Sequence, residues 1–468
     1  MNNKMVRVLL ALLCLSLFVM PVGCSDGENG GGIASVPTDD FQAANDTGKD
    51  SELYRRYAQY AENSSLAFKD CQEAADADFE YDIDAVGVAI TAYMGKDNIV
   101  VLPQSIGGVP VVKICEGAFS GAGLRAVYIP DTVKQIEKGA FYECDGLVTL
   151  RLPFIGDGAD QAFLGYIFGA ASSDENAVRV PPSLDMLIIG DGTEEVADNA
   201  LRGCKTLSAV VLSDTVASIG GLAFYECADL VYVSLGSGVE SIGEYSFAYC
   251  LSLYSLDCSG VDEIGNGALY SCSSLNTIAY CPQKDDFLGR IFGAEIAEYN
   301  ADFVPVSLRN VTIAEGCDVI PDMAFSSCKY ITSVTLPSSL NTVGVRAFYG
   351  CRSLREIKIP DSVKTIYDDA FFGCDAMTSA ELGSYLESLG MQAFYGCKSL
   401  KSVDLPMSLQ EIKPSTFYGC ANLTSVSLGG VNTVGKDAFG NCISLVPISV
   451  DGITVREGNE ALSGVSKD

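Results

Sequence analysis

The chain has 468 residues and a formal net charge of −30, with no histidine and no tryptophan. A surface this acidic repels nucleic acid and anionic lipid headgroups, so we expect no nucleic-acid partner. Without histidine, the usual base of a Ser-His-Asp triad is missing. Hydrophobic residues make up 48% of the chain, which is enough for a long continuous core.

The first 23 residues resemble a bacterial secretion signal. Two basic residues precede an apolar run over 8–20, and Gly23 and Cys24 follow it. The run has the length of a signal-peptide core and is too short for a membrane span of ~20 residues. The Gly-Cys pair favours a lipoprotein signal over 1–23, with Cys24 as the lipid attachment site. The alternative is a plain cleaved signal peptide, because Pro21 departs from the usual aliphatic residue.

Two segments separate this signal from the rest of the chain. Residues 24–50 are acidic and contain the run SDGENGGG, which predicts a flexible tether because such a composition cannot bury a core. Residues 51–80 have partly periodic apolar positions and predict a short helix.

One phrase, Ala-Phe-x-x-Cys-x-x-Leu-x-x-Val-x-Leu-Pro, recurs through residues 114–450. Its Phe position is filled at steps of 22 or 23 residues from Phe325 to Phe439, and Leu201 and Leu269 replace Phe in two copies. A fixed period of this size is typical of a solenoid. Each coil is too short to bury its own apolar face, so stacking at ~4.8 Å is expected to bury Phe on Phe and Leu on Leu.

Each coil also predicts its own strand. In Leu354-x-x-Ile357-x-Ile359 the last two apolar residues alternate with polar ones, which is the period of a half-buried strand. Two zones near 154–190 and 281–313 break the repeat and contain the similar runs LGYIFGA and LGRIFGA. We interpret them as copies of one longer coil.

These motifs resemble the BspA-like leucine-rich repeat proteins of bacterial surfaces, whose consensus is close to VxxIGxxAFxxCxxLxxVxLPxS. The resemblance covers roughly Asp82 to Val450. It implies a β-rich solenoid, a right-handed coil of ~22–23-residue repeats with a parallel sheet on its concave face. It also implies that residues 81–113 form an N-terminal β cap.

Eleven of the 18 cysteines stand three residues after the Phe position. They are Cys144, Cys204, Cys227, Cys250, Cys272, Cys328, Cys351, Cys374, Cys397, Cys420 and Cys442. Identical side chains in a parallel stack point the same way, which favours a ladder of buried, reduced thiols. Disulfides between coils remain geometrically open, since stacked Cα atoms lie ~5 Å apart. Without close Cys-x-x-Cys pairs or histidine, we expect no metal and no cofactor.

Aromatic residues often follow the Phe position directly. They are Tyr142, Tyr225, Tyr270, Tyr349, Phe372, Tyr395 and Tyr418. One interpretation is an exposed aromatic stripe that stacks on sugars or on a partner protein. The other is a ladder of rings that pack from coil to coil and expose only their hydroxyl groups to water. The resemblance favours the second, because this tyrosine belongs to the family consensus.

The outward strand positions vary from coil to coil, as a binding face would. The candidates are Tyr232, Ser234, Asp257, Glu356, Lys358, Glu381 and Asp404. They are expected on the sheet face, where solenoids usually bind. The alternative is that these small and acidic side chains only keep the sheet face hydrated and bind no partner.

The sequence contains no nucleophile elbow, and its carboxylate pairs follow from composition, so we expect no enzyme. The main hypothesis is a monomeric, surface-tethered recognition or adhesion module that binds an extracellular protein or glycan. It would cross the inner membrane and remain at the cell surface, attached only by its lipid anchor. The alternatives are a carbohydrate-capture component of an envelope uptake system and a purely structural envelope protein.

Residues 451–468 follow the last full repeat. A solenoid needs a terminal unit that hides its last apolar face. Ile453 and Val455 alternate with polar residues, so we expect them to add an edge strand as a C-terminal cap. The chain is expected to fray after about Gly464.

Overall fold

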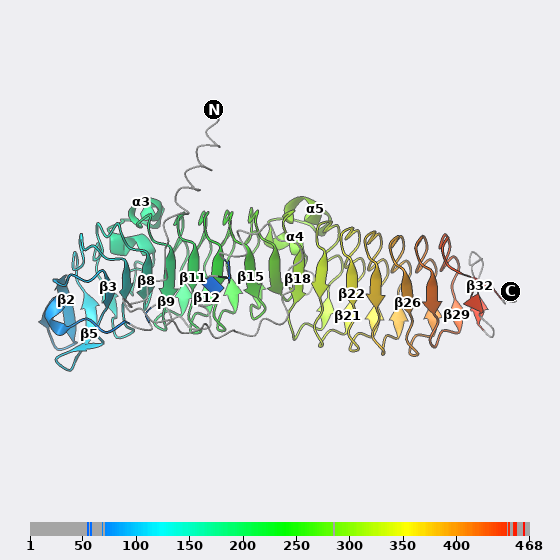
Figure 1. Ribbon diagram of the computed structural model, residues 1–468, viewed down its shortest axis with the longest axis horizontal. Coiled ribbons are helices and arrows are strands. Elements are labelled where there is room, and N and C mark those ends of the chain that lie inside the picture. Colours follow the sequence, from blue (N-terminus) through cyan, green and yellow to red (C-terminus); the bar gives the residue numbers. More distant parts are fainter. Residues whose placement is uncertain are drawn as a thin grey trace, which may run out of the picture.

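The chain folds into a long solenoid of stacked coils (Figure 1). The computed structural model describes residues 54–55, 57–58, 68, 71–283, 286–446, 448–449, 453–455 and 462–463. They wind through about 15 turns at ~23-residue spacing, with parallel strands stacked from turn to turn. The predicted leucine-rich repeat solenoid is therefore confirmed.

One strand of each coil adds to a long parallel array, which we call the long sheet. Its strands are β3 (Ile99–Val101), β6 (Ala126–Tyr128), β8 (Thr149–Leu152), β9 (Met186–Ile189), β11 (Ala209–Val211), β13 (Tyr232–Ser234), β15 (Ser255–Cys258), β17 (Thr277–Tyr280), β18 (Asn310–Ile313), β20 (Ser333–Thr335), β22 (Glu356–Lys358), β24 (Ser379–Glu381), β26 (Ser402–Asp404) and β28 (Ser425–Ser427). Each residue pairs with its counterpart one coil later, as Glu356 does with Ser379.

A second, shorter strand in most coils forms another parallel array. These strands are β7 (Gln135–Ile136), β10 (Glu195–Val196), β12 (Ser218–Ile219), β14 (Ser241–Ile242), β16 (Glu263–Ile264), β19 (Val319–Ile320), β21 (Thr342–Val343), β23 (Thr365–Ile366), β25 (Ser388–Leu389), β27 (Glu411–Ile412), β29 (Thr433–Val434) and β31 (Thr454–Val455). Each two-residue strand up to β29 buries its second residue, which closes the core opposite the long sheet.

The first coil is covered by a small mixed sheet. It contains β1 (Phe79–Ile83), β2 (Val88–Tyr93), β4 (Ser105–Ile106) and β5 (Val109–Ile114), preceded by the 3₁₀ turn η2 (Asp76–Asp78). β1 and β4 run antiparallel to β2 and β5, whereas β5 pairs in parallel with β7 of the solenoid. The ring of Tyr93 stacks on Phe119, which hides the first phenylalanine of the core.

The repeated phenylalanines stack inside the solenoid. From Phe325 to Phe439 neighbouring ring centroids lie 5.0–5.5 Å apart, with interplanar angles of 3–9°. All of these rings are almost fully buried. Backbone hydrogen bonds also link neighbouring coils here, since the Phe371 amide donates at 2.8 Å to the carbonyl of Ala393, the residue before the next stacked phenylalanine.

The eleven repeat cysteines form the buried, free ladder that the repeat predicts. Nine of them donate Sγ–H to the carbonyl of the Phe-position residue one coil earlier, at 3.1–3.4 Å. Burial raises the pKa of Cys227, Cys272 and Cys351 to about 12, so these thiols stay protonated at neutral pH. Each of these carbonyls also accepts the backbone amide three residues further on, as Phe348 does from Cys351 at 3.2 Å, so the thiol adds a second hydrogen bond that links neighbouring coils.

The two irregular zones have the same local structure. The first contains η3 (Leu164–Phe168), η4 (Ser173–Glu175) and α3 (Asn176–Arg179); the second contains α4 (Leu288–Ile291), η5 (Ala297–Tyr299) and α5 (Asn300–Phe303). A fully buried asparagine organises each, since Asn176 accepts from the Gly165 amide and Asn300 accepts from the Gly289 amide. The two zones therefore repeat one local structure.

A disulfide between Cys281 and Cys317 closes the second irregular zone. These two cysteines lie outside the repeat ladder, and no motif of the sequence distinguishes them. In the first zone the Thr193 hydroxyl donates to the Pro153 carbonyl at 3.1 Å, at the corresponding place after β8 and β9. A hydrogen bond in one copy is thus replaced by a covalent link in the other.

The C-terminal coil ends in three short strands. β31 pairs in parallel with β29, and the partly buried Ile453 packs against the core, so a strand extends the shorter array where one was expected. β30 (Ile448–Ser449) pairs with β32 (Leu462–Ser463). The expected fraying after Gly464, the signal over 1–23, Cys24 and the tether over 24–50 lie outside the described residues. No helix in the described part of the chain is long and apolar enough to span a bilayer.

Candidate binding face

The C-terminal half of the long sheet presents a polar surface. In β20, β22, β24 and β26 the outer residues are exposed and the central residue is buried. We call this surface the open half. Its outer side chains are Ser333, Thr335, Glu356, Lys358, Ser379, Glu381, Ser402, Asp404, Ser425 and Ser427.

Charges on the open half project into solvent. Lys358 Nζ lies 4.0 Å from Glu381 Oε2, and both side chains are more than two-thirds exposed. An ion pair of this kind contributes little to stability, so folding does not account for these charges. A shallow groove of about 500 Å³ runs over β20, β22 and β24 and includes Glu356, Lys358 and Glu381. Three of the predicted face residues therefore lie together.

The N-terminal half of the same sheet has an apolar outer surface, which we call the covered half. Six of its outer residues are buried and apolar and form a cluster separate from the main core. They are Ala126, Met186, Ile188, Ala209, Val211 and Tyr232. β9 reads Met-Leu-Ile-Ile and β11 reads Ala-Val-Val, so these strands bury both faces.

Residues upstream of the β cap cover this surface. We call the described residues 54–55, 57–58 and 68 the strap. Phe68 packs edge to face on Tyr128, with ring centroids 5.5 Å apart. The Tyr57 hydroxyl donates to Asp185 at 2.7 Å, and only 3% of Tyr57 is exposed. Tyr54 packs edge to face on Tyr232 at 5.2 Å. The helical strap residues therefore lie against the coils of β9 to β15 (Figure 1, dark blue), whereas Phe68 lies against β6, closer to the N-terminal end of the solenoid.

Helical backbone occurs at the described strap residues 54–55 and 57–58, within the segment for which a short helix was predicted. Where this segment docks was not predicted. The chain then returns to the β cap, where the Ala74 amide donates to the Val101 carbonyl at 2.9 Å. The described strap residues thus contact the outer face at both ends of the covered half, Tyr54 beside β13 and β15 and Phe68 beside β6.

The predicted face residues divide between the two halves. Glu356, Lys358, Glu381 and Asp404 are exposed as expected. The expectation for Tyr232 was wrong, because the strap covers it and leaves 5% of it exposed. Ser234 is partly buried and Asp257 is exposed, and both lie where the covered half ends.

The aromatic positions after the Phe ladder form two kinds of contact. Tyr349, Phe372, Tyr395 and Tyr418 stack face to face, with neighbouring centroids 4.6–5.0 Å apart. Their ring faces are therefore occupied by one another, which supports the packing interpretation. Tyr225 instead meets Tyr249 edge to face at 5.4 Å, and Tyr142 remains 41% exposed. Sugar stacking on these positions stays a prediction.

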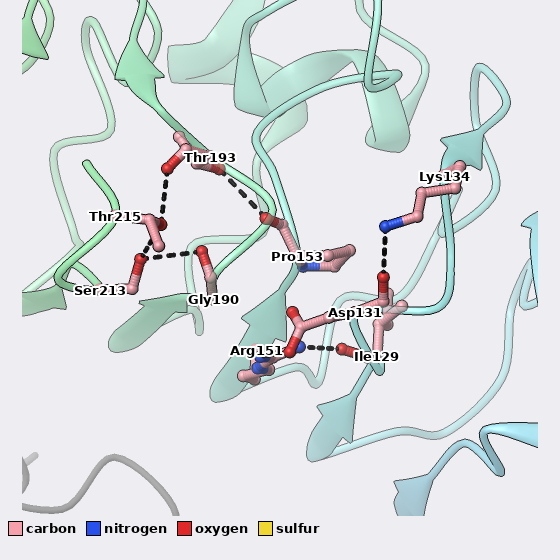
Figure 2. A network of polar contacts seen from close by, with 9 residues as sticks. All are labelled: Ile129, Asp131, Lys134, Arg151, Pro153, Gly190, Thr193, Ser213 and Thr215. Carbon is pink, nitrogen blue, oxygen red and sulfur yellow. Dashed lines mark hydrogen bonds and ion pairs between the residues drawn. The ribbon is translucent and has the colours of Figure 1, made fainter. Parts of the chain in front are cut away.

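Hydroxyl groups and one arginine join the ends of neighbouring strands (Figure 2). Arg151 donates to the Ile129 carbonyl at 2.5 Å and to Asp131 at 2.6 Å. Gly190 leaves room for this guanidinium, since a Cβ there would lie 2.1 Å from Arg151 Nη2. Ser213 Oγ donates to the Gly190 carbonyl at 3.0 Å. The charge of Arg151 is therefore engaged within the protein.

An open cavity of about 810 Å³ lies beside these strand ends. Tyr54 of the strap forms one side of it, and the ends of β9, β11, β13 and β15 form the other. The predicted residues Tyr232, Ser234 and Asp257 all line it. No group of three or more potential metal ligands occurs among the described residues.

The sequence matches a known repeat family over most of its length. The family described as BspA type Leucine rich repeat region (6 copies) matches residues 105–164, 176–297, 299–384 and 341–464. The chain belongs to this family. It is thus a leucine-rich repeat protein of BspA type, a class of bacterial surface repeats.

Solved structures give more distant likenesses. A leucine-rich repeat protein from Bacteroides ovatus is 22% identical, with 81% of this chain and 98% of that chain covered and a TM-score of 0.33. A leucine rich cell surface protein from Faecalibacterium prausnitzii is 24% identical, with 76% and 94% covered and a TM-score of 0.27. The pneumococcal vaccine antigen PcpA is 16% identical, with 83% and 94% covered and a TM-score of 0.26. No curated protein matches the chain.

Proposed function

We propose that this BspA-type protein is a non-enzymatic recognition module tethered to the bacterial surface, and that it binds an extracellular protein through the open half. One observation carries the proposal. The outer residues from β20 to β28 are polar and unpaired with any other described part of the chain, whereas Ala126, the outer residues of β9 and β11, and Tyr232 are apolar and covered. The strap thus leaves one face of the solenoid for a partner.

The chemistry of the open half favours a protein partner. Serine and threonine side chains alternate with Glu356, Glu381 and Asp404 along a surface with one shallow groove. Carboxylates on such a surface steer association with a basic patch and fix its register. We expect a partner with Lys and Arg side chains, and tethering through Cys24 would hold the module at the cell surface.

Charge reversal tests the proposal. Purified protein would be applied to a panel of extracellular matrix proteins, and Kd values would be measured for each protein bound. The variant Glu356→Lys, Glu381→Lys, Asp404→Lys should lose at least tenfold in affinity, about 1.4 kcal/mol. The control reverses three exposed charges in or directly before short strands away from the face, Glu195→Lys, Glu387→Lys, Glu411→Lys, and should retain wild-type affinity.

Equal losses in both variants would contradict the proposal, since they would indicate general attraction to an acidic protein. Failure to bind any panel protein would instead favour a purely structural envelope protein. The tether has its own measurement, because Cys24→Ser should move the protein from the membrane fraction to the soluble fraction.

A further inference from the structure

The cavity beside Tyr54 is larger than the groove of the open half, and its lining is different. Its volume of about 810 Å³, against about 500 Å³ for that groove, lies within the usual range for small-ligand sites. It also needs two distant parts of the chain, since Tyr54 of the strap forms one side, and β8, β9, β11, β13 and β15 with the turns after them form the other.

We propose that this cavity is a binding site for a neutral oligosaccharide, completed by Tyr54 of the strap. The site is distinct from the protein-binding surface proposed for the open half.

The polar groups of the cavity mainly offer hydrogen-bond acceptors. Ser213 Oγ donates to the Gly190 carbonyl and also lies 2.8 Å from Thr215 Oγ1, which leaves it one lone pair for a ligand. Ser237 Oγ donates to Asp214 and keeps its lone pairs. Asp257 Oδ1 accepts from the Ser259 amide, and carboxylates have further acceptor capacity. A fitting ligand must therefore supply many donors, and the hydroxyl groups of a sugar do so.

Charge in the cavity excludes acidic ligands. The carboxylates of Asp191, Asp214 and Asp257 line it. The one lining cation, Arg151, is held by Asp131 and the Ile129 carbonyl and lies 4.7 Å over the ring of Tyr128. An anionic sugar or a phosphate would meet unpaired negative charge, which is unfavourable at short range.

Tyr54 supplies an aromatic surface at the rim. Its ring lies between those of Tyr232 and Tyr254, with ring centroids 5.2 and 6.0 Å from its own, and its hydroxyl forms a hydrogen bond with the Ser255 side chain. A ring held on two sides is already oriented for a ligand, so little side-chain entropy is lost on binding. Aromatic rings offer an apolar body next to a polar tip, which suits the mixed surface of a sugar.

The repeat also favours a polymeric ligand over a single small molecule. Ser213, Ser237 and Ser259 come from three successive turns after β11, β13 and β15. Coils stack at ~4.8 Å, so these acceptors come from adjacent coils, but at positions that are not equivalent: Val211 pairs with Ser234, which puts Ser213 opposite Gly236. A chain of sugar units presents hydroxyl groups that recur along its length.

The test uses the full protein and an array of neutral, acidic and amino-bearing oligosaccharides, followed by calorimetry with the neutral oligosaccharide that gives the strongest signal. Asp257→Asn should weaken binding at least tenfold. Its matched control is Asp404→Asn, which makes the same change at the same strand position in the open half and should leave the affinity unchanged. Tyr54→Ala should abolish saccharide binding. Because this change also removes contacts between the strap and the long sheet, it cannot separate the role of the cavity from that of the strap.

A blocking variant separates the cavity from the strap. A Cβ at Gly260 would meet no atom within 4 Å, so Gly260→Phe places a ring in open space without a clash in the core. It should abolish saccharide binding and leave the melting temperature and the binding of matrix proteins unchanged.

Three results would overturn the proposal: no saccharide binds, only acidic or amino-bearing saccharides bind, or Asp257→Asn and Asp404→Asn have equal effects. None of these results affects the protein-binding proposal, whose variants all lie outside the cavity.

Discussion

The covered and open halves of the long sheet are built from the same coil, yet their outer faces have opposite character. Ile188 in β9 and Glu381 in β24 are both the third residue of their strands and both point away from the core. Ile188 is 2% exposed beneath the strap, whereas Glu381 is exposed to solvent. The repeat therefore determines the inner face and leaves the outer face free to change along the array.

This separation follows from how a solenoid is stabilised. Each coil contacts only its neighbours, and the inner positions must match the coils on both sides. Outer positions have no such partner unless another segment supplies one. The strap supplies it from β3 to β15, and the apolar outer residues end where the strap ends.

The largest expected effect concerns the core that both halves share. Phe224→Ala beneath the covered half and Phe371→Ala beneath the open half should each cost ~3–5 kcal/mol, because each leaves a cavity in the core: Phe371 stacks on Phe348 and Phe394, and Phe224 stacks on Phe247. Both residues have 0% exposure. Chemical denaturation measures the loss, with Lys358→Ala as an exposed control that should change stability by less than ~0.5 kcal/mol. Clearly unequal losses for the two phenylalanines would mean that the halves also differ inside.

A smaller effect is expected when outer residues are exchanged between the halves. Ile188→Glu should cost ~2–3 kcal/mol, since it removes the burial of one large apolar side chain and places a charge under the strap. The matched change Glu381→Ile should leave stability nearly unchanged, because that position faces water. Limited proteolysis should cut Ile188→Glu within the strap sooner than the wild type. If Ile188→Glu is as stable and as resistant as Glu381→Ile, the strap does not depend on the covered half.

Much of the fold could be predicted because inner positions repeat. The Phe position, the cysteine ladder and the strand triplets such as Leu354, Ile357 and Ile359 recur at a fixed period, and each recurrence strengthens the same interpretation. The two irregular zones were found in the same way, since a long coil that occurs twice is itself a repeat.

The covered half was missed, although the sequence contains a signal for it. Continuous apolar runs in β9 and β11 differ from the alternating Glu-Ile-Lys of β22, and such runs indicate strands buried on both faces. The sequence of the strap has only weak periodicity. Its aromatic residues that contact the sheet, Tyr54, Tyr57 and Phe68, are too few and too unevenly spaced to define one face of a helix. The disulfide could not be predicted, since Cys281 and Cys317 meet only through the path of an irregular coil.

The smallest expected effect is a dependence on pH that both halves should share. In each half a carboxylate accepts the backbone amide of the next coil at 2.7 Å, Asp214 from Ser237 and Asp361 from Ser384. These hydrogen bonds lower the pKa of both aspartates below the usual value. A lowered folded-state pKa stabilises the fold above the unfolded value of ~3.9, and this contribution is lost as pH falls through the folded-state pKa.

Asp214→Asn and Asp361→Asn should therefore each lower the melting temperature slightly at neutral pH, and the difference from wild type should shrink below about pH 4. Melting curves recorded from neutral pH to pH 2.5 measure both, and a pH-independent difference would show that the charge of the carboxylate contributes nothing. Because Asp214 also lines the cavity next to the strap, a larger effect there than at Asp361 would show that the strap, rather than the shared coil, sets the electrostatics of the covered half.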